Sequence, residues 1–202
     1  MVNVHQMIIT AIIMYKGVIS QEYRIAFLEE MPKNCICAEI GAARGNWSKK
    51  IVDITKPKEL WLLDKWIYEG LYPPDYRIEF LENYFELRKK TKVVVLKGWF
   101  DDVHERMPKD YFDWIYLDLD HGYKTTAYQL RVCFDLIKQN GFLTGDDYGF
   151  LKDMPYHKGL VKAVDEFIDE YSDRIEVLYL NKNEPNNSLQ YKIRRKCYAS
   201  NI

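Results

Sequence analysis

Short apolar runs alternate with amphipathic stretches along most of this chain. Apolar residues return every three or four positions near 47–54, 78–90, 100–107, 125–139 and 159–171, which is the spacing of amphipathic helices. In the fourth of these segments Leu130, Cys133, Phe134 and Ile137 share one face, and Gly141 stands where a C-cap is expected. Between the helices lie short, strongly apolar runs, which indicate strands buried on both faces of a parallel sheet. These runs are 35–40, 59–64, 93–96, 114–118 and 142–144.

The pattern changes after Tyr171. Two strand-like segments, 174–180 and 189–193, flank a polar turn rich in asparagine, which predicts a hairpin and therefore an antiparallel edge. The predicted fold is a Rossmann-like, doubly wound α/β sheet of seven strands, mostly parallel with an antiparallel C-terminal hairpin strand. No repeat or low-complexity linker divides the chain. We therefore expect one domain over 1–202, with an N-terminal helical extension (1–31) and a core at 35–195.

The apolar run at 7–14 is too short to span a bilayer, which needs about 20 apolar residues. It also lacks the basic region and the cleavage site of a signal peptide. We interpret it as part of an N-terminal helix that packs on the domain or on a partner. This helix and the terminal hairpin are candidate surfaces for a homodimer.

Composition narrows the class of protein. A chain of 202 residues with 48% hydrophobic residues can bury a single core. The net charge of −1 and the pI of about 6.4 argue against binding to nucleic acid or an anionic membrane. Four cysteines are too few for a disulfide framework, so a reducing, cytoplasmic compartment is expected. Cys35 and Cys37 resemble half of a zinc site, but no second pair stands at ligand spacing, which favours buried thiols.

Small residues dominate the loop after the first predicted strand. Gly41, Ala42, Ala43 and Gly45 let the main chain approach a ligand, and the helix after this loop offers unpaired N–H groups. A dinucleotide-binding loop would need glycine at positions 41, 43 and 46, but Ala43 and Asn46 do not fit that pattern. The loop is therefore a ligand cradle of another kind.

This loop resembles the E/D-x-G-x-x-x-G signature of class I S-adenosylmethionine-dependent methyltransferases. The resemblance implies that Glu39 holds the amino-acid end of the cofactor and that Gly41, Ala43 and Gly45 surround the sulfonium arm.

Two further segments fit a cofactor at this edge of the sheet. Asp64 ends the second apolar run, where an acid accepts hydrogen bonds from both ribose hydroxyls; the alternative is that it only ends a strand and caps the next segment. Gly98, Trp99 and Phe100 fall where the family places adenine, although Trp99 is equally compatible with a core position.

Acidic residues follow two neighbouring predicted strands. Asp118, Asp120 and His121 come after the fourth apolar run, and Asp146 and Asp147 come after the fifth. Carboxylates at adjacent strand ends are suited to a hard divalent ion, with Mg²⁺ as the first choice. The alternative is that these acids only cap helices.

The pattern F-D-x-I-Y-x-D-x-D-H-x-Y, then G-x-x-x-G-D-D-Y, carries a second resemblance, which covers about 35–171. It is similar to a group of small class I methyltransferases, of the methyltransferase 24 type, that includes the macrocin-type sugar O-methyltransferases. By position, this implies Asp118, Asp146 and Asp147 as metal ligands and Asp120 as the base. We also expect Asp118 to contact the cofactor. His121 departs from the macrocin-type pattern and is a second candidate for the base, with an unperturbed pKa suited to neutral pH.

The sequence thus predicts a methyltransferase that uses S-adenosylmethionine and a divalent metal to methylate a hydroxyl of a sugar, a glycan or another small molecule. Trp66, Tyr68, Tyr72 and Tyr76 are candidates for aromatic acceptor walls or for a lid that packs on itself. One alternative is a methyltransferase acting on nucleic acid or protein, although the lysines between 49 and 65 are offset by acids. Another is a non-catalytic module that only binds the cofactor.

Overall fold

A computed structural model describes residues 24–66, 75–148, 155–180 and 190–197. Its centre is a seven-stranded sheet in the order β3-β2-β1-β4-β5-β7-β6. Strands β1 to β5 are parallel, and β7 pairs antiparallel with both β5 and β6. The predicted fold class is confirmed, including its C-terminal hairpin. The strands are β1 (Ile36–Ile40), β2 (Glu59–Asp64), β3 (Lys92–Lys97), β4 (Phe112–Leu117), β5 (Ile137–Gly145), β6 (Ile175–Leu180) and β7 (Tyr191–Arg195).

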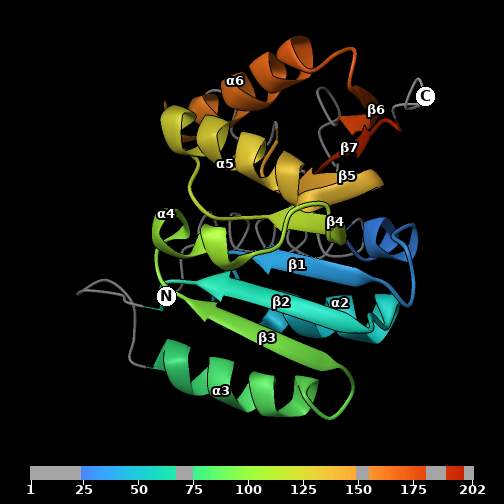
Figure 1. Cartoon of the computed structure of the whole chain (residues 1–202). Helices are drawn as coiled ribbons and strands as arrows, with labels where there is room; N and C mark the ends of the chain where they lie inside the picture. The colour runs from blue at the N-terminus through green and yellow to red at the C-terminus, as the bar shows by residue number, and fades with distance from the viewer. Residues whose placement is uncertain (1–23, 67–74, 149–154, 181–189, 198–202) are drawn as a thin grey trace, which may run out of the picture.

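Helices cover both faces of this sheet. The helices are α2 (Asn46–Thr55), α3 (Asp75–Leu87), α4 (Phe100–Val103), which continues as the 3₁₀ turn η1 (His104–Arg106), α5 (Tyr123–Leu136) and α6 (Pro155–Glu170). Residues 24–29 are also helical. Figure 1 shows α5 and α6 side by side on the β4–β5 half of the sheet and α3 beside β3.

Each face of the sheet has its own apolar core, because successive side chains of a strand point to opposite faces. Trp114 and Tyr116 of β4 pack with the side of the molecule formed by residues 24–31, α2 and α3. Ile115 and Leu117 pack with α4, α5 and α6. The end of β4, which carries Asp118, therefore stands on a strand that is buried on both faces.

The boundary between the fourth predicted helix and the next strand is wrong. The helix expected to reach residue 139 ends at Leu136, and β5 begins at Ile137. Gly141 therefore lies within the strand and does not cap a helix. Phe112 pairs with Ile137 and Trp114 pairs with Phe142, so the intervening residues of β5 bulge opposite Asp113. A side chain on Gly141 would lie 2.8 Å from the Lys138 carbonyl oxygen, which explains why glycine stands there.

Two expectations lie outside the described residues, namely the apolar run at 7–14 and the aromatic residues Tyr68 and Tyr72. The side chain of Tyr76 is not described either. Within the described part of the chain, no helix is both long and apolar enough to cross a bilayer.

Backbone hydrogen bonds align the carboxyl ends of the strands. The Asp118 amide donates to the Ile40 carbonyl at 2.8 Å. The Gly98 amide donates to the main-chain carbonyl of Asp64 at 3.0 Å, and the Asp146 amide donates to the main-chain carbonyl of Leu117 at 3.3 Å. The loops after β1 to β5 therefore all start at the carboxyl ends of the parallel strands, which is where an open α/β sheet binds ligands.

Candidate functional site

The loop after β1 lies against the backbone of the loop after β4. Gly41 has a φ of 103°, and a Cβ placed on it would lie 1.9 Å from the Asp118 carbonyl oxygen. Only glycine fits this contact. Ala43 and Gly45 also adopt positive φ values, of 45° and 80°. The small residues singled out in the sequence thus give a tight loop that leads directly into α2.

Glu39 is buried at the end of β1, with 2% of its surface exposed. The Ser48 hydroxyl, from the first turns of α2, donates a hydrogen bond to its carboxylate. Burial raises the pKa of Glu39 to about 8, although the Ser48 hydrogen bond opposes the shift. The predicted cofactor acid therefore lies beneath the loop, and its charge is stabilised when a cationic group such as an ammonium approaches.

Asp64 holds the loop from the end of β2. Its Oδ2 accepts the Ala43 amide at 2.9 Å, and its Oδ1 accepts the Trp66 amide at 3.0 Å. The Trp66 indole donates to the Ala43 carbonyl at 2.7 Å and its ring packs on Phe80. Trp66 is therefore buried and supports the loop after β1 (residues 41–45, the cofactor loop). It is not an exposed ring against which an acceptor could stack.

The segment after β3 divides into an exposed and a buried part. Trp99 is 57% exposed, and the Lys65 ammonium lies 4.2 Å from its ring centroid. Phe100 is buried and stacks on His104. Gly98 has a φ of 153°, and a Cβ there would lie 2.6 Å from the Val103 side chain. Of the two interpretations of Trp99, the core position is excluded, and its ring is accessible to a flat heterocycle.

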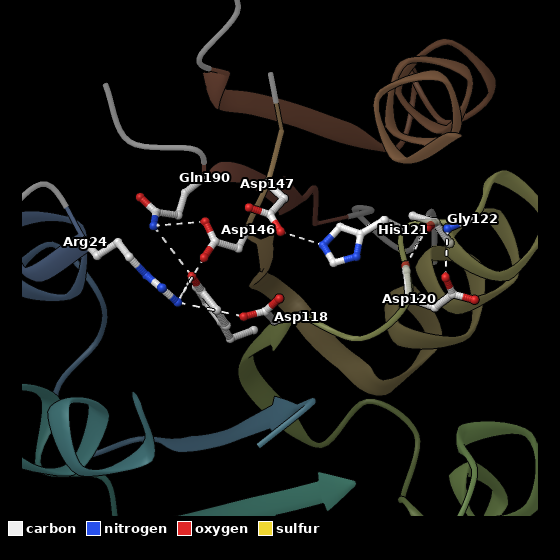
Figure 2. Close-up of polar contacts among 10 residues, drawn as sticks. Arg24, Asp118, Asp120, His121, Gly122, Asp146, Asp147 and Gln190 are labelled. Atoms are coloured by element: carbon white, nitrogen blue, oxygen red, sulfur yellow. Dashed lines mark hydrogen bonds and ion pairs between the residues drawn. The ribbon is translucent and has the colours of Figure 1, made fainter. Parts of the chain in front are cut away.

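Three polar side chains converge at the ends of β4 and β5. Asp118, His121 and Asp147 each place one ligand atom within 4.8 Å of the other two, an arrangement that could hold a metal ion. His121 Nε2 lies 2.5 Å from Asp147 Oδ2, and Figure 2 shows the ring aimed at that carboxylate. We name these three residues the β4–β5 cluster.

The electrostatics of the β4–β5 cluster are those of crowded acids. Burial raises the pKa of Asp118 to about 7, and the neighbouring Asp146 adds to the shift. Burial acts to lower the pKa of His121, but the hydrogen bond and charge of Asp147 outweigh it, so that pKa is raised. Such crowding is relieved when a cation binds. Asp147 also has a φ of 61°, a left-handed conformation that aspartate adopts more readily than most residues other than glycine.

Asp146 neighbours Asp118 but is not a member of the β4–β5 cluster. Its Oδ2 lies 2.9 Å from Arg24 Nη2, and its Oδ1 accepts a 3.4 Å hydrogen bond from Gln190. The same guanidinium donates to the Tyr116 hydroxyl at 3.1 Å and lies 3.8 Å from Asp118 Oδ2. Figure 2 shows that Arg24, in the helical segment 24–29 before β1, points toward both Asp118 and Asp146. Of the three carboxylates expected to bind a metal, two join the cluster and the third pairs with an arginine.

Arg24 was not identified by the sequence analysis. It lies outside every recognised motif, and nothing in the local pattern of residues 24–31 distinguishes this arginine from a surface one. The one available signal was the acid-rich strand ends, which require counter-charge from some other part of the chain.

Asp120 faces away from the cluster. Its Oδ1 accepts the Gly122 amide at 2.9 Å, directly before α5 begins. Figure 2 shows this carboxylate turned toward Gly122, on the other side of His121 from Asp147. Of the two candidate bases, His121 is therefore the one that lies beside Asp118 and Asp147.

Comparison with known proteins gives one family and many solved structures with a similar fold. A family model described as a methyltransferase domain matches residues 38–148, more than half of the chain. This span runs from β1 to the end of the Gly-Asp-Asp-Tyr segment and contains the cofactor loop and the β4–β5 cluster. No curated protein matches the chain.

Solved structures with this fold include three that cover most of the chain. A protein assigned as an rRNA methylase from Clostridium thermocellum has a TM-score of 0.65 at 11% identity, over 89% of this chain and 97% of its own. A protein assigned as a methyltransferase from Streptococcus mutans, in complex with S-adenosylhomocysteine, has a TM-score of 0.61 at 15% identity, over 87% of this chain and 97% of its own. A protein assigned as a caffeoyl-CoA O-methyltransferase from Staphylococcus aureus has a TM-score of 0.60 at 16% identity, over 91% of this chain and 83% of its own. At these identities the likeness is one of fold.

Proposed function

The chain belongs to the methyltransferase domain family and is an S-adenosylmethionine-dependent methyltransferase, and from this premise we propose that it methylates a hydroxyl oxygen of a small molecule with the help of a divalent cation. Sugars and glycans are the first acceptor candidates. The observation that carries the proposal is the convergence of Asp118, His121 and Asp147 beside the cofactor loop.

We propose that the methyl donor lies across the carboxyl ends of β3, β2 and β1. Asp64 is positioned for the ribose hydroxyls, Trp99 for adenine and Glu39 for the amino-acid end. The order of β3, β2 and β1 in the sheet matches the order of these three parts in the donor. A donor held by these residues would offer its methyl group to an acceptor bound near the loop after β4, and methyl transfer requires in-line approach of the acceptor oxygen.

The β4–β5 cluster fits a divalent ion. Asp118 and Asp147 supply carboxylate oxygens, and Mg²⁺ usually takes one or two of these and keeps several waters. The raised pKa of Asp118 shows that carboxylates crowd this site, and a cation relieves the repulsion between them. When bound, the ion supplies Lewis acidity that lowers the pKa of an acceptor hydroxyl.

His121 is proposed as the group that removes the hydroxyl proton. A base held by a hydrogen bond to a third group is the usual arrangement around an activated oxygen, and Asp147 holds the His121 ring in this way. Asp120 then has a local role, since its carboxylate fixes the turn that carries His121 into α5.

The test is methyl transfer from labelled S-adenosylmethionine to a panel of sugars and catechol-type phenols, with Mg²⁺, with Mn²⁺ and with EDTA. We expect turnover that requires metal and is lost in Asp147→Ala. Asp135→Ala is a matched control, because Asp135 is an exposed acid that pairs with Lys109 on the surface. Full turnover in EDTA together with full turnover of Asp147→Ala would exclude metal assistance.

The alternative acceptor, a nucleic acid or protein, requires a basic face. Lysines near α2 and β3 are paired with acids, namely Lys90 with Asp53 and Lys92 with Glu59. These pairs favour a solvated surface over a polyanion-binding one. RNA and protein substrates added to the same panel test this directly.

A further inference from the structure

Two stacked side chains beside the acidic site carry buried N–H donors that have no partner in the described part of the chain. These donors are Nε of Arg24 and Nε1 of Trp47. The Arg24 guanidinium carbon lies 4.3 Å from the centroid of the Trp47 ring, and that ring packs at 5.5 Å on Tyr116. The two donors thus belong to one group of packed side chains, which rests on the fully buried Tyr116.

Buried donors in folded proteins nearly always have an acceptor, because an unsatisfied donor forfeits its hydrogen bonds to water. Two of them in contacting side chains, at the edge of a ligand site, indicate an acceptor that arrives with the ligand. A carboxylate suits this pair, since it accepts from a guanidinium and an indole at once. We propose that Arg24 and Trp47 bind the α-carboxylate at the methionine end of the methyl donor.

The position of the pair along the sheet fits this ligand. Trp99 and Asp64 follow β3 and β2, whereas Asp118 and Asp146 follow β4 and β5. Arg24 contacts both of the latter acids, and Trp47 is in the first turn of α2, directly after the loop that follows β1. A donor whose ribose lies on Asp64 therefore extends its methionine end toward this pair.

The charges of the site support the same assignment. The methionine end carries an ammonium and a carboxylate. Glu39 and Asp118 suit the ammonium, but they repel the carboxylate unless positive charge lies nearby. Arg24 brings that charge into the acidic site, and its Nη2 is held by Tyr116 and Asp146 so that the guanidinium is fixed before the ligand binds. Fixing the group in advance reduces the entropy lost on binding.

The inference rests on the methyl donor of the proposed function, and it depends neither on the acceptor nor on the metal. It is tested by calorimetry in EDTA with two ligands that differ at the relevant end. S-adenosylhomocysteine carries the α-carboxylate, whereas 5′-methylthioadenosine lacks the whole amino-acid moiety. The variants are Arg24→Met, which retains an unbranched stem, and Trp47→Phe, which keeps an aromatic ring but removes the N–H.

We expect Arg24→Met to weaken S-adenosylhomocysteine about 10- to 100-fold and Trp47→Phe to weaken it about 3- to 10-fold, as for the loss of hydrogen bonds to a charged group. Binding of 5′-methylthioadenosine should stay within about twofold in both variants, which also shows that they fold. Arg131→Met removes an exposed arginine paired with Glu170 and should change neither affinity. Arg24→Lys keeps the charge and should lose less than Arg24→Met.

Unchanged affinity for S-adenosylhomocysteine in either variant would overturn the inference, and so would an equal loss for both ligands. If the wild-type chain bound neither ligand, the donor site itself would be wrong. That result is distinct from a failure of metal assistance, because no metal is present in this experiment.

Discussion

His121 Nε2 and Asp147 Oδ2, 2.5 Å apart, join the loop after β4 to the loop after β5. The contact fixes the imidazole relative to a carboxylate whose backbone is in the left-handed region. It also brings a nitrogen into a pair of strand ends where the sequence pattern predicted oxygen ligands alone. The chemistry of the site depends on whether this nitrogen takes a proton or binds the ion.

His121→Asn separates these two roles. If His121 is the base, Mn²⁺ affinity measured by calorimetry should stay within about threefold, while turnover falls by about 10²- to 10⁴-fold, the usual contribution of a general base. Asp120→Asn keeps an oxygen that can accept the Gly122 amide and should retain most of the turnover. Loss of Mn²⁺ binding in His121→Asn would instead make His121 a ligand.

Metal binding should strengthen as pH rises through 7. Burial raises the pKa of Asp118 to about 7 in the metal-free protein, so below that pH its proton must leave before an ion binds. Affinity then falls by up to about tenfold for each pH unit below 7 for one displaced proton. Calorimetry with Mn²⁺ at pH 6, 7 and 8 measures the slope, and two buffers of different ionisation enthalpy count the protons. A flat affinity between pH 6 and 8 would contradict the shift at Asp118.

Glu39→Gln should increasingly stabilise the ligand-free protein relative to wild type as pH rises from 5 to 8. The folded-state pKa of Glu39, about 8, exceeds the ordinary value of 4.5. Between these two values the unfolded chain has already lost the proton that the folded chain retains, so stability falls as pH rises. Gln cannot titrate. The melting temperature of Glu39→Gln relative to wild type should therefore rise progressively from pH 5 to pH 8.

Glu59→Gln is the control for that series. Burial opposes ionisation of Glu59, but hydrogen bonds from Lys92 and Trp61 outweigh it and lower its pKa. Its contribution to stability is thus already complete above pH 5 and is lost only in more acidic solution. A difference from wild type that grew between pH 6 and 8 in Glu59→Gln as well would show that Glu39 is not the source.

Gly41→Ala should damage both stability and donor binding. The added Cβ would meet the Asp118 carbonyl oxygen at 1.9 Å, at a φ that side chains rarely adopt. We expect a loss of about 2 kcal/mol or more in the free energy of unfolding. Gly122→Ala is a milder comparison, because Gly122 has a φ of −68° and a Cβ there would lie 3.0 Å from the Thr125 hydroxyl. Denaturant melts of both variants measure the difference, and equal losses would contradict the contact.

The sequence predicted those parts of the site that depend on strand ends. Asp64 ends a strongly apolar run and Glu39 is the residue before the end of another, and the carboxyl ends of parallel strands lie together. The same reasoning placed Asp118 and Asp147 close together. It could not distinguish Asp146 from Asp147, because adjacent residues point in different directions and local backbone geometry decides which one enters the cluster. The φ of 61° at Asp147 is not encoded in any spacing.

Contacts between distant segments were the other limit. Asp120 has the position of a base in the motif, yet its carboxylate accepts the Gly122 amide, a use that competes with catalysis. Arg24 reaches Asp146 from a helix before the first strand. Periodicity describes which face of an element is buried, but it does not identify which charged side chain reaches across from another element.

The ion pair between Arg24 and Asp146 also constrains the order in which the protein folds during synthesis. Its two members are separated by the first five strands of the sheet, so the pair can form only after β5 has been synthesised and inserted beside β4. Long-range contacts of this kind are made late, because closing the intervening loop costs entropy before the contact is gained. A nascent chain that had completed only its first three strands would carry the cofactor loop without its arginine fixed in place. The protein would then be able to bind the methyl donor only when most of its sheet has folded.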